Sequence, residues 1–304
     1  MFFRNLTLFR FPKSTSKSLA ELDGLLGDHR LRPCGPIELA TRGFVSPYGR
    51  DSDELTHRAG KFTLLAIGSE DKLLPSSVIG EALAVKIAEI TEKEARRIGA
   101  RERKRLKEEV MTDLLPRAFV RPSRVFAYLD EAQGWMVIDT ASRKLAEEAV
   151  TQLREALGRF PATPMAPTDS PRTLMTDWLV GGKLPQGLSW GDECELRDPA
   201  EAGAVVRCRR QDLESDEVRE HLKSGKQVFQ LGLEFDGRMA FVLGEDLTIR
   251  KFRFLDIVLD EIGEDAAESA RAELDARFAL MTLETRRLLE KLDEVPYLRL
   301  RSAA

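Results

Sequence analysis

The most regular pattern of apolar and polar positions in this 304-residue chain lies between Pro75 and Pro116. Its spacing predicts a helix over residues 78–100 and a second helix over residues 102–115, with a break at Gly99-Ala100. Proline lacks an amide hydrogen and clashes with the preceding turn, so the two prolines limit the helical region. We therefore expect a helical hairpin.

The apolar face of this hairpin is short. In the first helix it consists of Val78, Ile79, Leu83, Ile87 and Ile90. Ser76 or Ser77 precedes this row and is expected to cap the helix. Between Lys86 and Lys107 there are nine basic residues and four glutamates. Because so few apolar residues cannot bury much surface, we expect a projecting finger with a basic end.

Charge alone leaves two interpretations of the finger open. Lysine and arginine release condensed counterions from phosphates, so the finger is suited to contact a polyanion without reading its sequence. The alternative is a solvated hairpin held by ion pairs one turn apart, such as Glu89 with Lys93 and Glu92 with Arg96.

The first part of the chain combines strands with one early helix. Residues 3–11 show the rough alternation of a strand, and residues 61–67 have the composition of a buried strand. Residues Ser18–Glu21 have the form of a capping box, which predicts a helix ending near Asp28. Residues 43–49 are expected to form a loop or a short strand, and the region from there to Gly60 is expected to be irregular.

A hairpin, a helix and a connector are expected next. Residues 125–130 and 135–139 predict a β-hairpin. Ser142 is a suitable cap for a helix that ends near Leu157. Three prolines fall within residues 160–170, which predicts an extended connector and the first boundary between two halves of the chain.

The second half again mixes helices and strands. Its expected elements are a helix over residues 174–180, a strand over 204–209, a helix over 213–224 with Asp212 as its N-cap, a meander over 227–235, 239–243 and 248–254, and a helix over 266–292. The two halves share no repeat at the level of residues.

Composition narrows the classes of function. The formal net charge is −4, so any nucleic-acid surface must be a local basic patch. Residues 256–304 are acidic. Three scattered cysteines form no CxxC pair, which favours a reducing compartment. The start of the chain lacks the pattern of a signal peptide, and no apolar run is long enough to span a membrane, so we expect a cytoplasmic protein.

Candidate catalytic chemistry is sparse. The three histidines lack metal-ligand spacing, and only His57, which follows Asp53 and Glu54, is a candidate base or ligand. No phosphate loop, nucleophile elbow or HExxH motif is present. Two further sets are expected to be structural: a solvated acidic turn of Asp192, Glu193 and Glu195, and small apolar cysteines at Cys34, Cys194 and Cys208. We expect no enzyme activity, cofactor or metal.

Two further basic groups stand out. In the strand that ends at Arg209-Arg210-Gln211, alternation places Arg207 and Arg209 on one face, with Cys208 and Arg210 on the other. These residues suit either phosphate contacts or a strand edge protected by charge. The second group, Arg117, Arg121 and Arg124, surrounds Phe119, which is either a core residue or an exposed anchor for another subunit.

Several short motifs resemble the RdgC family of bacterial recombination-associated proteins. They keep their order along nearly the whole chain: residues 3–6 (FRNL), 33–35 (PCG), 55–57 (LTH), 73–79 (LLPSSVI), 114–119 (LLPRAF), 210–213 (RQDL), 225–226 (GK) and 277–282 (RFALMT). The combination of LLPRAF with LPSSVI is specific to this resemblance.

The resemblance implies an α+β fold. The subunit is expected to be a horseshoe with two related α/β halves and a projecting helical tip, closing into a ring-shaped homodimer around duplex DNA. Residues 1–74 and 117–165 would form the first half, 75–116 the tip hairpin, 166–255 the second half and base, and 256–304 an acidic helical segment.

The resemblance also assigns residues. Arg117, Arg210 and Gln211 are expected to face the hole of the ring, and Phe119 to form the contact between two tips. From charge we add Arg209, Arg97, Arg121 and Lys226 as DNA-binding candidates. Where a relative has Lys-Lys-Gln-Asp-Leu, this chain has Arg209–Leu213, and the planar fork of arginine is not equivalent to a lysine ammonium group.

The implied function is sequence-independent binding of duplex DNA, and possible binding of single strands, that limits RecA-promoted recombination in the nucleoid. One alternative is a protein-interaction module whose basic finger docks an acidic partner. The other is a nuclease with scattered carboxylates, which would cleave strands in a metal-dependent way.

Overall fold

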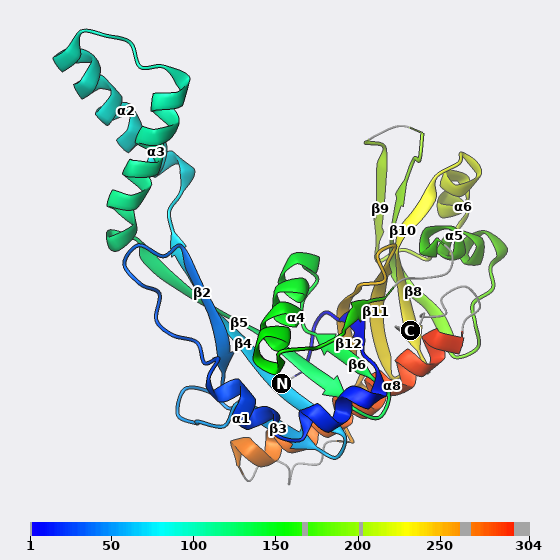
Figure 1. Cartoon of the computed structure of the whole chain (residues 1–304). Helices are drawn as coiled ribbons and strands as arrows, with labels where there is room; N and C mark the ends of the chain where they lie inside the picture. The colour runs from blue at the N-terminus through cyan, green and yellow to red at the C-terminus, as the bar shows by residue number, and fades with distance from the viewer. Residues whose placement is uncertain (1, 166–169, 201–202, 262–268, 295–304) are drawn as a thin grey trace.

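The computed structural model describes residues 2–165, 170–200, 203–261 and 269–294, without the side chains of residues 16–18. Within these ranges the protein is an α+β protein with two antiparallel sheets, as expected. Figure 1 shows the sheets side by side in the body, with a pair of helices projecting from the first sheet.

The first sheet carries the projecting helices on its two longest strands. The strand order is β2-β4-β5-β6-β1-β7, with β3 also paired to β4. Strands β4 and β5 pair over their full twelve residues, from Phe62 opposite Asp130 to Leu73 opposite Phe119. The seven strands are β1 (Thr7–Arg10), β2 (Ala40–Val45), β3 (Thr56–Ala59), β4 (Phe62–Leu73), β5 (Phe119–Asp130), β6 (Trp135–Ile138) and β7 (Thr163–Pro164).

Two expectations for this sheet need correction. Strand β1 is shorter than predicted, because the amides of Arg4 and Asn5 donate to Oδ1 of Asp139 (2.8 and 2.9 Å) instead of joining the ladder. The region between residue 49 and Gly60 is not wholly irregular, because β3 begins at Thr56, whereas the alternative of a short strand within residues 43–49 agrees with β2, which reaches Val45.

The second sheet has the order β12-β11-β10-β8-β9. The expected meander is confirmed, but the acidic turn was a wrong prediction: Asp192, Glu193 and Glu195 lie within strand β8. Alternation sends Glu193 and Glu195 to the face opposite the core residue Cys194. The five strands are β8 (Leu188–Arg197), β9 (Val205–Arg209), β10 (Gln227–Phe235), β11 (Met239–Gly244) and β12 (Ile249–Phe254).

Helices cover the sheets and form the projection. They are α1 (Leu22–Gly27), α2 (Ser76–Glu94), α3 (Ala100–Leu114), α4 (Arg143–Leu157), α5 (Pro171–Gly181), α6 (Asp216–Lys223), α7 (Asp256–Leu259) and α8 (Ala270–Glu294), with 3₁₀ turns over Lys13–Leu19 and Leu115–Arg117. The predicted cap of α4 is confirmed, because Ser142 accepts a hydrogen bond from the Leu145 amide.

The other predicted caps are wrong. Helix α1 begins only at Leu22, after a 3₁₀ turn that runs through the supposed capping box. Helix α6 begins after Ser215, because Asp212 uses its carboxylate to accept from the Glu214 amide (2.9 Å) in a turn of its own. Helix α2 is preceded by Pro75 in an extended conformation, without a side-chain cap.

Two apolar clusters lie on opposite faces of the first sheet. On one face, α1 and α4 pack on residues such as Leu65 and Leu129. On the other face, a larger cluster joins Leu64 and Tyr128 to α8 and to the second sheet. A backbone bridge between Leu6 and Ile249 also joins the two sheets, so the apolar core is continuous across the expected boundary between halves.

Helix α8 is tied to both sheets by charged side chains. Arg286 donates two hydrogen bonds of 2.7 Å to Asp130 at the end of β5, whose side chain is only 2% exposed. Glu284 accepts two hydrogen bonds (2.9 and 3.0 Å) from Arg238, in the turn between β10 and β11. A buried carboxylate needs such a partner, so these contacts fix the helix against both sheets.

We expect Arg286→Ala to lower the free energy of unfolding by about 3 kcal/mol, because it leaves the buried Asp130 carboxylate without its cation. Chemical denaturation followed by circular dichroism measures the change. The matched control is Arg271→Ala in the same helix, whose exposed ion pair with Glu54 contributes less than about 1 kcal/mol. Equal losses in the two variants would contradict the anchoring role of Arg286.

Candidate nucleic-acid interface

The finger of α2 and α3 projects far from the two sheets (Figure 1). Its buried apolar contact is small and includes Ile79, Leu83, Leu106 and Val110. Helix α2 ends at Glu94, earlier than predicted, and Ala95 adopts a left-handed conformation with φ of 46°. The break comes early because residues 91–97 are all exposed and no packing extends the helix.

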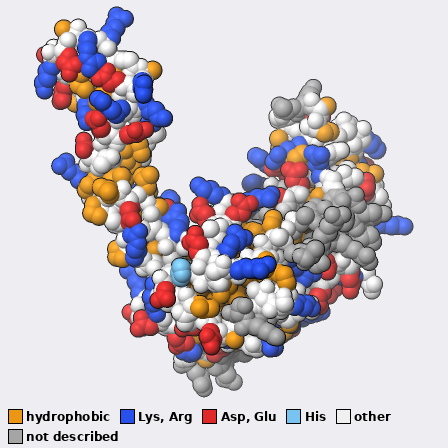
Figure 2. Space-filling model, viewed as in Figure 1, with side chains coloured by type: hydrophobic (Ala, Val, Ile, Leu, Met, Phe, Trp, Pro, Cys, Tyr) orange, Lys and Arg blue, Asp and Glu red, His pale blue; other side chains and the backbone are white. Residues whose placement is uncertain are grey.

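The finger keeps most of its positive charge unpaired. Neither Glu89–Lys93 nor Glu92–Arg96 forms the predicted ion pair; Arg96 instead binds Glu94 and Glu102. Figure 2 shows basic side chains at the end of the finger. Within the described ranges, six exposed basic residues of the finger have no ion pair: Lys93, Arg97, Arg101, Arg103, Lys104 and Lys107. These side chains are free to meet phosphates.

An apolar collar surrounds the root of the finger. We use this name for Leu73, Val78, Phe119 and Val120, all of which are exposed, with Phe119 at 83%. Leu73 and Phe119 are directly opposed at the far end of the β4–β5 ladder. Figure 2 shows apolar side chains gathered between the basic end and the body. The sequence left open whether Phe119 is core or anchor, and its exposure excludes a place in the core of the subunit.

The arginines next to the collar differ in their surroundings. Arg117 is exposed on the 3₁₀ turn Leu115–Arg117, which is held by a 2.8 Å hydrogen bond from Lys72 Nζ to the Leu115 carbonyl. Arg121 lies opposite Asp71. Burial would raise the pKa of Asp71, but hydrogen bonds from Arg42 and Ser69 lower it, and the charge of Arg121 adds to this lowering. Arg117 therefore has the more available charge.

Arg124 lies three residues after Arg121 in β5. Its guanidinium group is 5.5 Å from the ring centroid of Phe126, within cation–π range. This contact holds the side chain against the strand, so Arg124 is less available than Arg117.

The second basic group lies on an edge of the second sheet. Strand β9 pairs with β8, so that Arg207 is opposite Glu195 and Arg209 is opposite Glu193. The predicted common face for the two arginines is confirmed. Glu195 is only 7% exposed, and burial would raise its pKa, but hydrogen bonds from Arg207 and Arg197 (both 2.7 Å) bring the pKa below its ordinary value.

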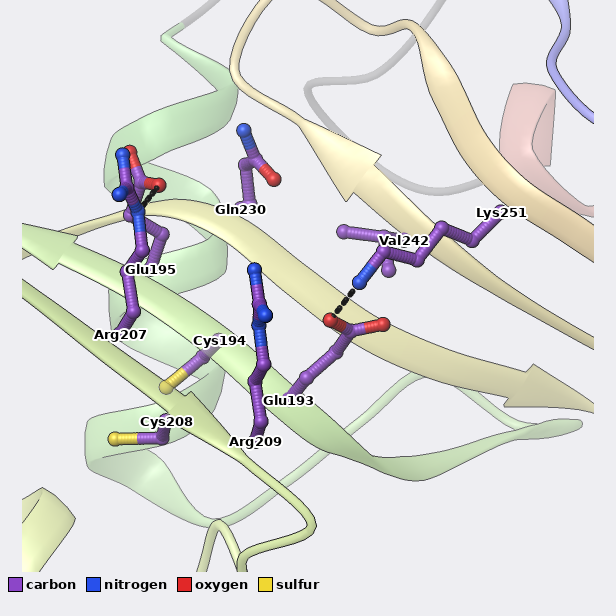
Figure 3. Close-up of a pocket in the computed structure, with 9 residues that line it drawn as sticks. All are labelled: Glu193, Cys194, Glu195, Arg207, Cys208, Arg209, Gln230, Val242 and Lys251. Carbon is purple, nitrogen blue, oxygen red and sulfur yellow. Dashed lines mark hydrogen bonds and ion pairs between the residues drawn. The ribbon is translucent and has the colours of Figure 1, made fainter.

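The face of β8 and β9 contains both paired and free cations, as Figure 3 shows. Glu193 binds Lys251 of β12 and leaves Arg209, its direct neighbour across the ladder, without an ion pair in the described structure. Arg209 projects over the sheet toward Gln230 (Figure 3). These side chains line a small pocket of about 100 Å³. The ion pairs within it leave the Arg209 guanidinium group without a counter-charge among the described residues.

The strand ends differently from the prediction at its last basic residue. Arg210 has a φ of 52°, which is a left-handed conformation, so alternation stops at Arg209. The amide of Gln211 then donates to the Asp192 carbonyl (3.0 Å), which holds the turn against β8. The Gln211 side chain lies near Ser215 (3.3 Å), and Arg210 is exposed.

The predicted site residues fall on two projections from the same side of the body. Arg97 lies on the finger, with Arg117 and Arg121 at its root, whereas Arg209–Gln211 lies at the C-terminal end of β9, opposite to the end where Val205 pairs with Arg197. Figure 2 shows an open space between the two projections. Lys226 is half-buried, with Nζ 3.2 Å from the Ser224 hydroxyl. It precedes the start of β10, which lies beside Arg197 and therefore at the other end of β9 from Arg209 and Arg210.

His57 has a structural setting that the sequence did not indicate. It is 3% exposed, its Nδ1 lies 2.7 Å from the Tyr48 hydroxyl, and its Nε2 lies 3.2 Å from Asp275 of α8. Burial lowers the pKa of His57, although Asp275 opposes that shift. Asp275 lies far away in the chain, so sequence spacing carried no signal for this contact.

The described residues offer little for other kinds of site. Within the described ranges, no group of three or more His, Cys, Asp or Glu side chains is arranged to hold a metal ion. Cys34, Cys194 and Cys208 are free thiols; only Cys194 is fully buried as predicted, and the other two are half-buried. None of the helices in the described part of the chain could span a membrane.

Comparisons with known proteins cover nearly the whole chain. A family model described as "RdgC: Putative exonuclease, RdgC" matches residues 1–296. The "Recombination-associated protein RdgC" of Xanthomonas campestris pv. campestris (strain B100) is 51% identical over 295 residues, which is 97% of each chain. The proteins of the same name from Xanthomonas axonopodis pv. citri (strain 306) and Xylella fastidiosa (strain 9a5c) are 51% and 50% identical, over 95% and 97% of each chain.

The lowered pKa of His57 predicts a dependence of stability on pH. Below about pH 6.5 this histidine takes up a proton in the unfolded chain, whereas in the folded protein it stays neutral to lower pH. The free energy of unfolding therefore falls as pH falls, by at most about 1.4 kcal/mol per pH unit. We expect His57→Gln to flatten this slope in denaturation between pH 7 and 5. His221→Gln, on the surface helix α6, is the control and should keep the wild-type slope.

Proposed function

The chain belongs to the RdgC family of recombination-associated proteins, and on this premise we propose that it encircles duplex DNA as a ring-shaped homodimer. Each subunit would be one horseshoe, with the finger as one arm and the β8–β9 end as the other. DNA held in this way is withdrawn from RecA, which limits recombination in the nucleoid of the cytoplasm. Single strands are a further possible ligand.

One observation carries this proposal: each of the two projections that flank the open space carries exposed cations that have no acidic partner in the described structure. The whole chain has a net charge of −4, so it has no general attraction to a polyanion. The six unpaired basic residues of the finger, with Arg117, Arg209 and Arg210, form a local basic lining.

The geometry favours contacts to phosphates rather than to base edges. Arg117 and Arg210 each lie on a turn whose backbone is held to its neighbouring strand by a hydrogen bond, so the backbone at both arginines starts from a fixed position. Arginine can donate two parallel hydrogen bonds to one phosphate. Phosphate contacts carry no sequence information, so the binding would be sequence-independent and sensitive to salt.

The apolar collar supports closure of the ring between two copies of the finger. Phe119 is a large aromatic side chain that the subunit itself does not cover, and Val120 and Leu73 extend its apolar surface. Burial of such residues is the usual source of energy at the centre of an interface. Two basic fingers repel each other, so this contact would open more easily than one between neutral surfaces, which suits a gate for DNA.

Two other functions are distinguished by the same measurements. A protein-interaction module that docks an acidic partner predicts no DNA affinity at moderate salt. An exonuclease, the activity in the description of the matching family model, predicts shortening of end-labelled DNA in the presence of a divalent metal. Incubation of end-labelled duplex with Mg²⁺ or Mn²⁺ during the binding assay tests this second function directly.

We expect Arg117→Ala combined with Arg210→Ala to weaken duplex binding at least about tenfold and to reduce the salt slope, because each lost phosphate contact removes roughly one released counterion. Fluorescence anisotropy with a labelled duplex across a salt series measures both quantities. Binding should not depend on the sequence of the duplex.

The matched control for this experiment is Arg32→Ala combined with Arg271→Ala. It removes the same charge from two exposed arginines that are already bound to Glu38 and Glu54. We expect nearly unchanged binding. If the two double variants lose affinity equally, net charge rather than the proposed contacts controls binding.

We expect Phe119→Asp to raise the dissociation constant of the dimer at least about tenfold, since a charge replaces an interface anchor. Sedimentation velocity over a range of concentrations measures this constant. Val180→Asp changes another exposed apolar residue (65% exposed) outside the collar and should leave the dimer intact. A wild-type monomer at all concentrations would rule out the ring.

A further inference from the structure

We propose that Cys194 and Cys208 form a reversible disulfide bond that ties strand β9 to strand β8. The two residues are register partners in the antiparallel ladder, and both are free thiols. Opposed residues in such a ladder have Cα atoms about 4.5 or 5.5 Å apart. Both separations lie within the range of about 4.4 to 6.8 Å that a disulfide requires.

The two side chains meet on the same face of the ladder. Figure 3 shows both sulfur atoms on one side of the strands, away from the Arg209 and Glu193 side chains. The two thiols lie close enough to influence each other, because Cys208 adds to the burial that raises the pKa of Cys194. The backbone therefore needs little movement for a bond to form.

The different exposure of the two thiols sets the order of the reaction. Cys194 is buried, and burial raises its pKa, so it remains a protonated thiol. Cys208 is half-buried on the edge strand and is the thiol that an oxidant reaches first. This pair thus has an attacking residue and a resolving residue next to each other.

With a peroxide as the oxidant, the reaction balances in two steps. The thiolate of Cys208 attacks one peroxide oxygen, forms a sulfenic acid and releases hydroxide, which takes the proton lost by the thiol. The sulfur of Cys194 then attacks the sulfenic sulfur, and the hydroxyl group leaves with the Cys194 proton as water. Two thiols are oxidised to one disulfide, and one peroxide is reduced to two water molecules.

The bond would act on the edge of the second sheet. Among the described strands, β9 pairs only with β8, so no second neighbour holds it. Strand β9 leads directly into Arg209–Gln211, and a covalent tie at Cys208 would restrict the motion of that basic turn. This modification does not depend on whether the protein binds DNA.

Cys34 provides an internal control in the same molecule. It is also half-buried, but it lies near the first sheet, where its backbone amide donates to Glu70 (2.8 Å) and its thiol to the Glu38 carbonyl (3.4 Å). In the described structure no other cysteine faces it. An oxidant should therefore leave Cys34 as a thiol or a mixed adduct, without an internal partner.

The test treats the full-length protein with hydrogen peroxide, then blocks free thiols by alkylation and maps the digested peptides by mass spectrometry without reduction. We expect a linked peptide pair containing Cys194 and Cys208, with the loss of two hydrogen atoms, that dithiothreitol reverses. Amide hydrogen exchange in Val205–Arg209 should slow at least about tenfold after oxidation. Cys194→Ser should abolish both changes.

Three results would overturn the proposal. One is oxidation of Cys208 to a sulfinic acid while Cys194 remains a free thiol, which the alkylation step then labels. Another is a Cys208 bond between two separate chains. The third is a linked pair that includes Cys34, which would show that thiol exposure rather than register decides the product. The wild-type protein suffices for each result, so a variant that folds poorly does not weaken the test.

Discussion

The buried carboxylates of Asp130 and Glu284 impose the constraint on which the arrangement of both sheets depends. Neither can stay charged in the interior without a cation, and each receives two hydrogen bonds from an arginine on another element. Arg286 and Glu284 are both on α8. The same helix therefore pairs with Asp130 of the first sheet and with Arg238 of the second sheet. The positions of the finger and of the β9 edge are therefore set by the same helix.

Charge is arranged by pairing rather than by composition. On the second sheet, Glu193 and Glu195 neutralise Lys251, Arg197 and Arg207, and Arg209 at the end of β9 is left without an ion pair in the described structure. On the finger, glutamates bind a minority of the basic side chains. A protein with an acidic total can thus present separate basic surfaces, and those surfaces cannot be counted from the sequence without knowing which charges are paired.

The sequence predicted elements whose signals are local. The cap at Ser142, the meander of the second sheet and the shared face of Arg207 and Arg209 follow from neighbouring residues, and all three are confirmed. Strand β8 was missed because its acidic residues resemble a solvated loop until the arginine partners of Glu195 are known. The setting of His57 was missed for the same reason, because Asp275 is distant in sequence.

The paired strands β4 and β5 have a mechanical consequence for the finger. Twelve residues of strand extend roughly 40 Å at about 3.3 Å per residue, and the helices are attached at their far end. The first eight residues of β4 are buried in the body, so roughly 13 Å of the ribbon extends beyond it. A rotation of roughly 5° at that point would move the far end of the ribbon by roughly 1 Å, and the ends of the attached helices by more, because displacement grows with distance from the pivot. The ribbon is therefore a lever, and a substitution near α8 can move the finger without touching it.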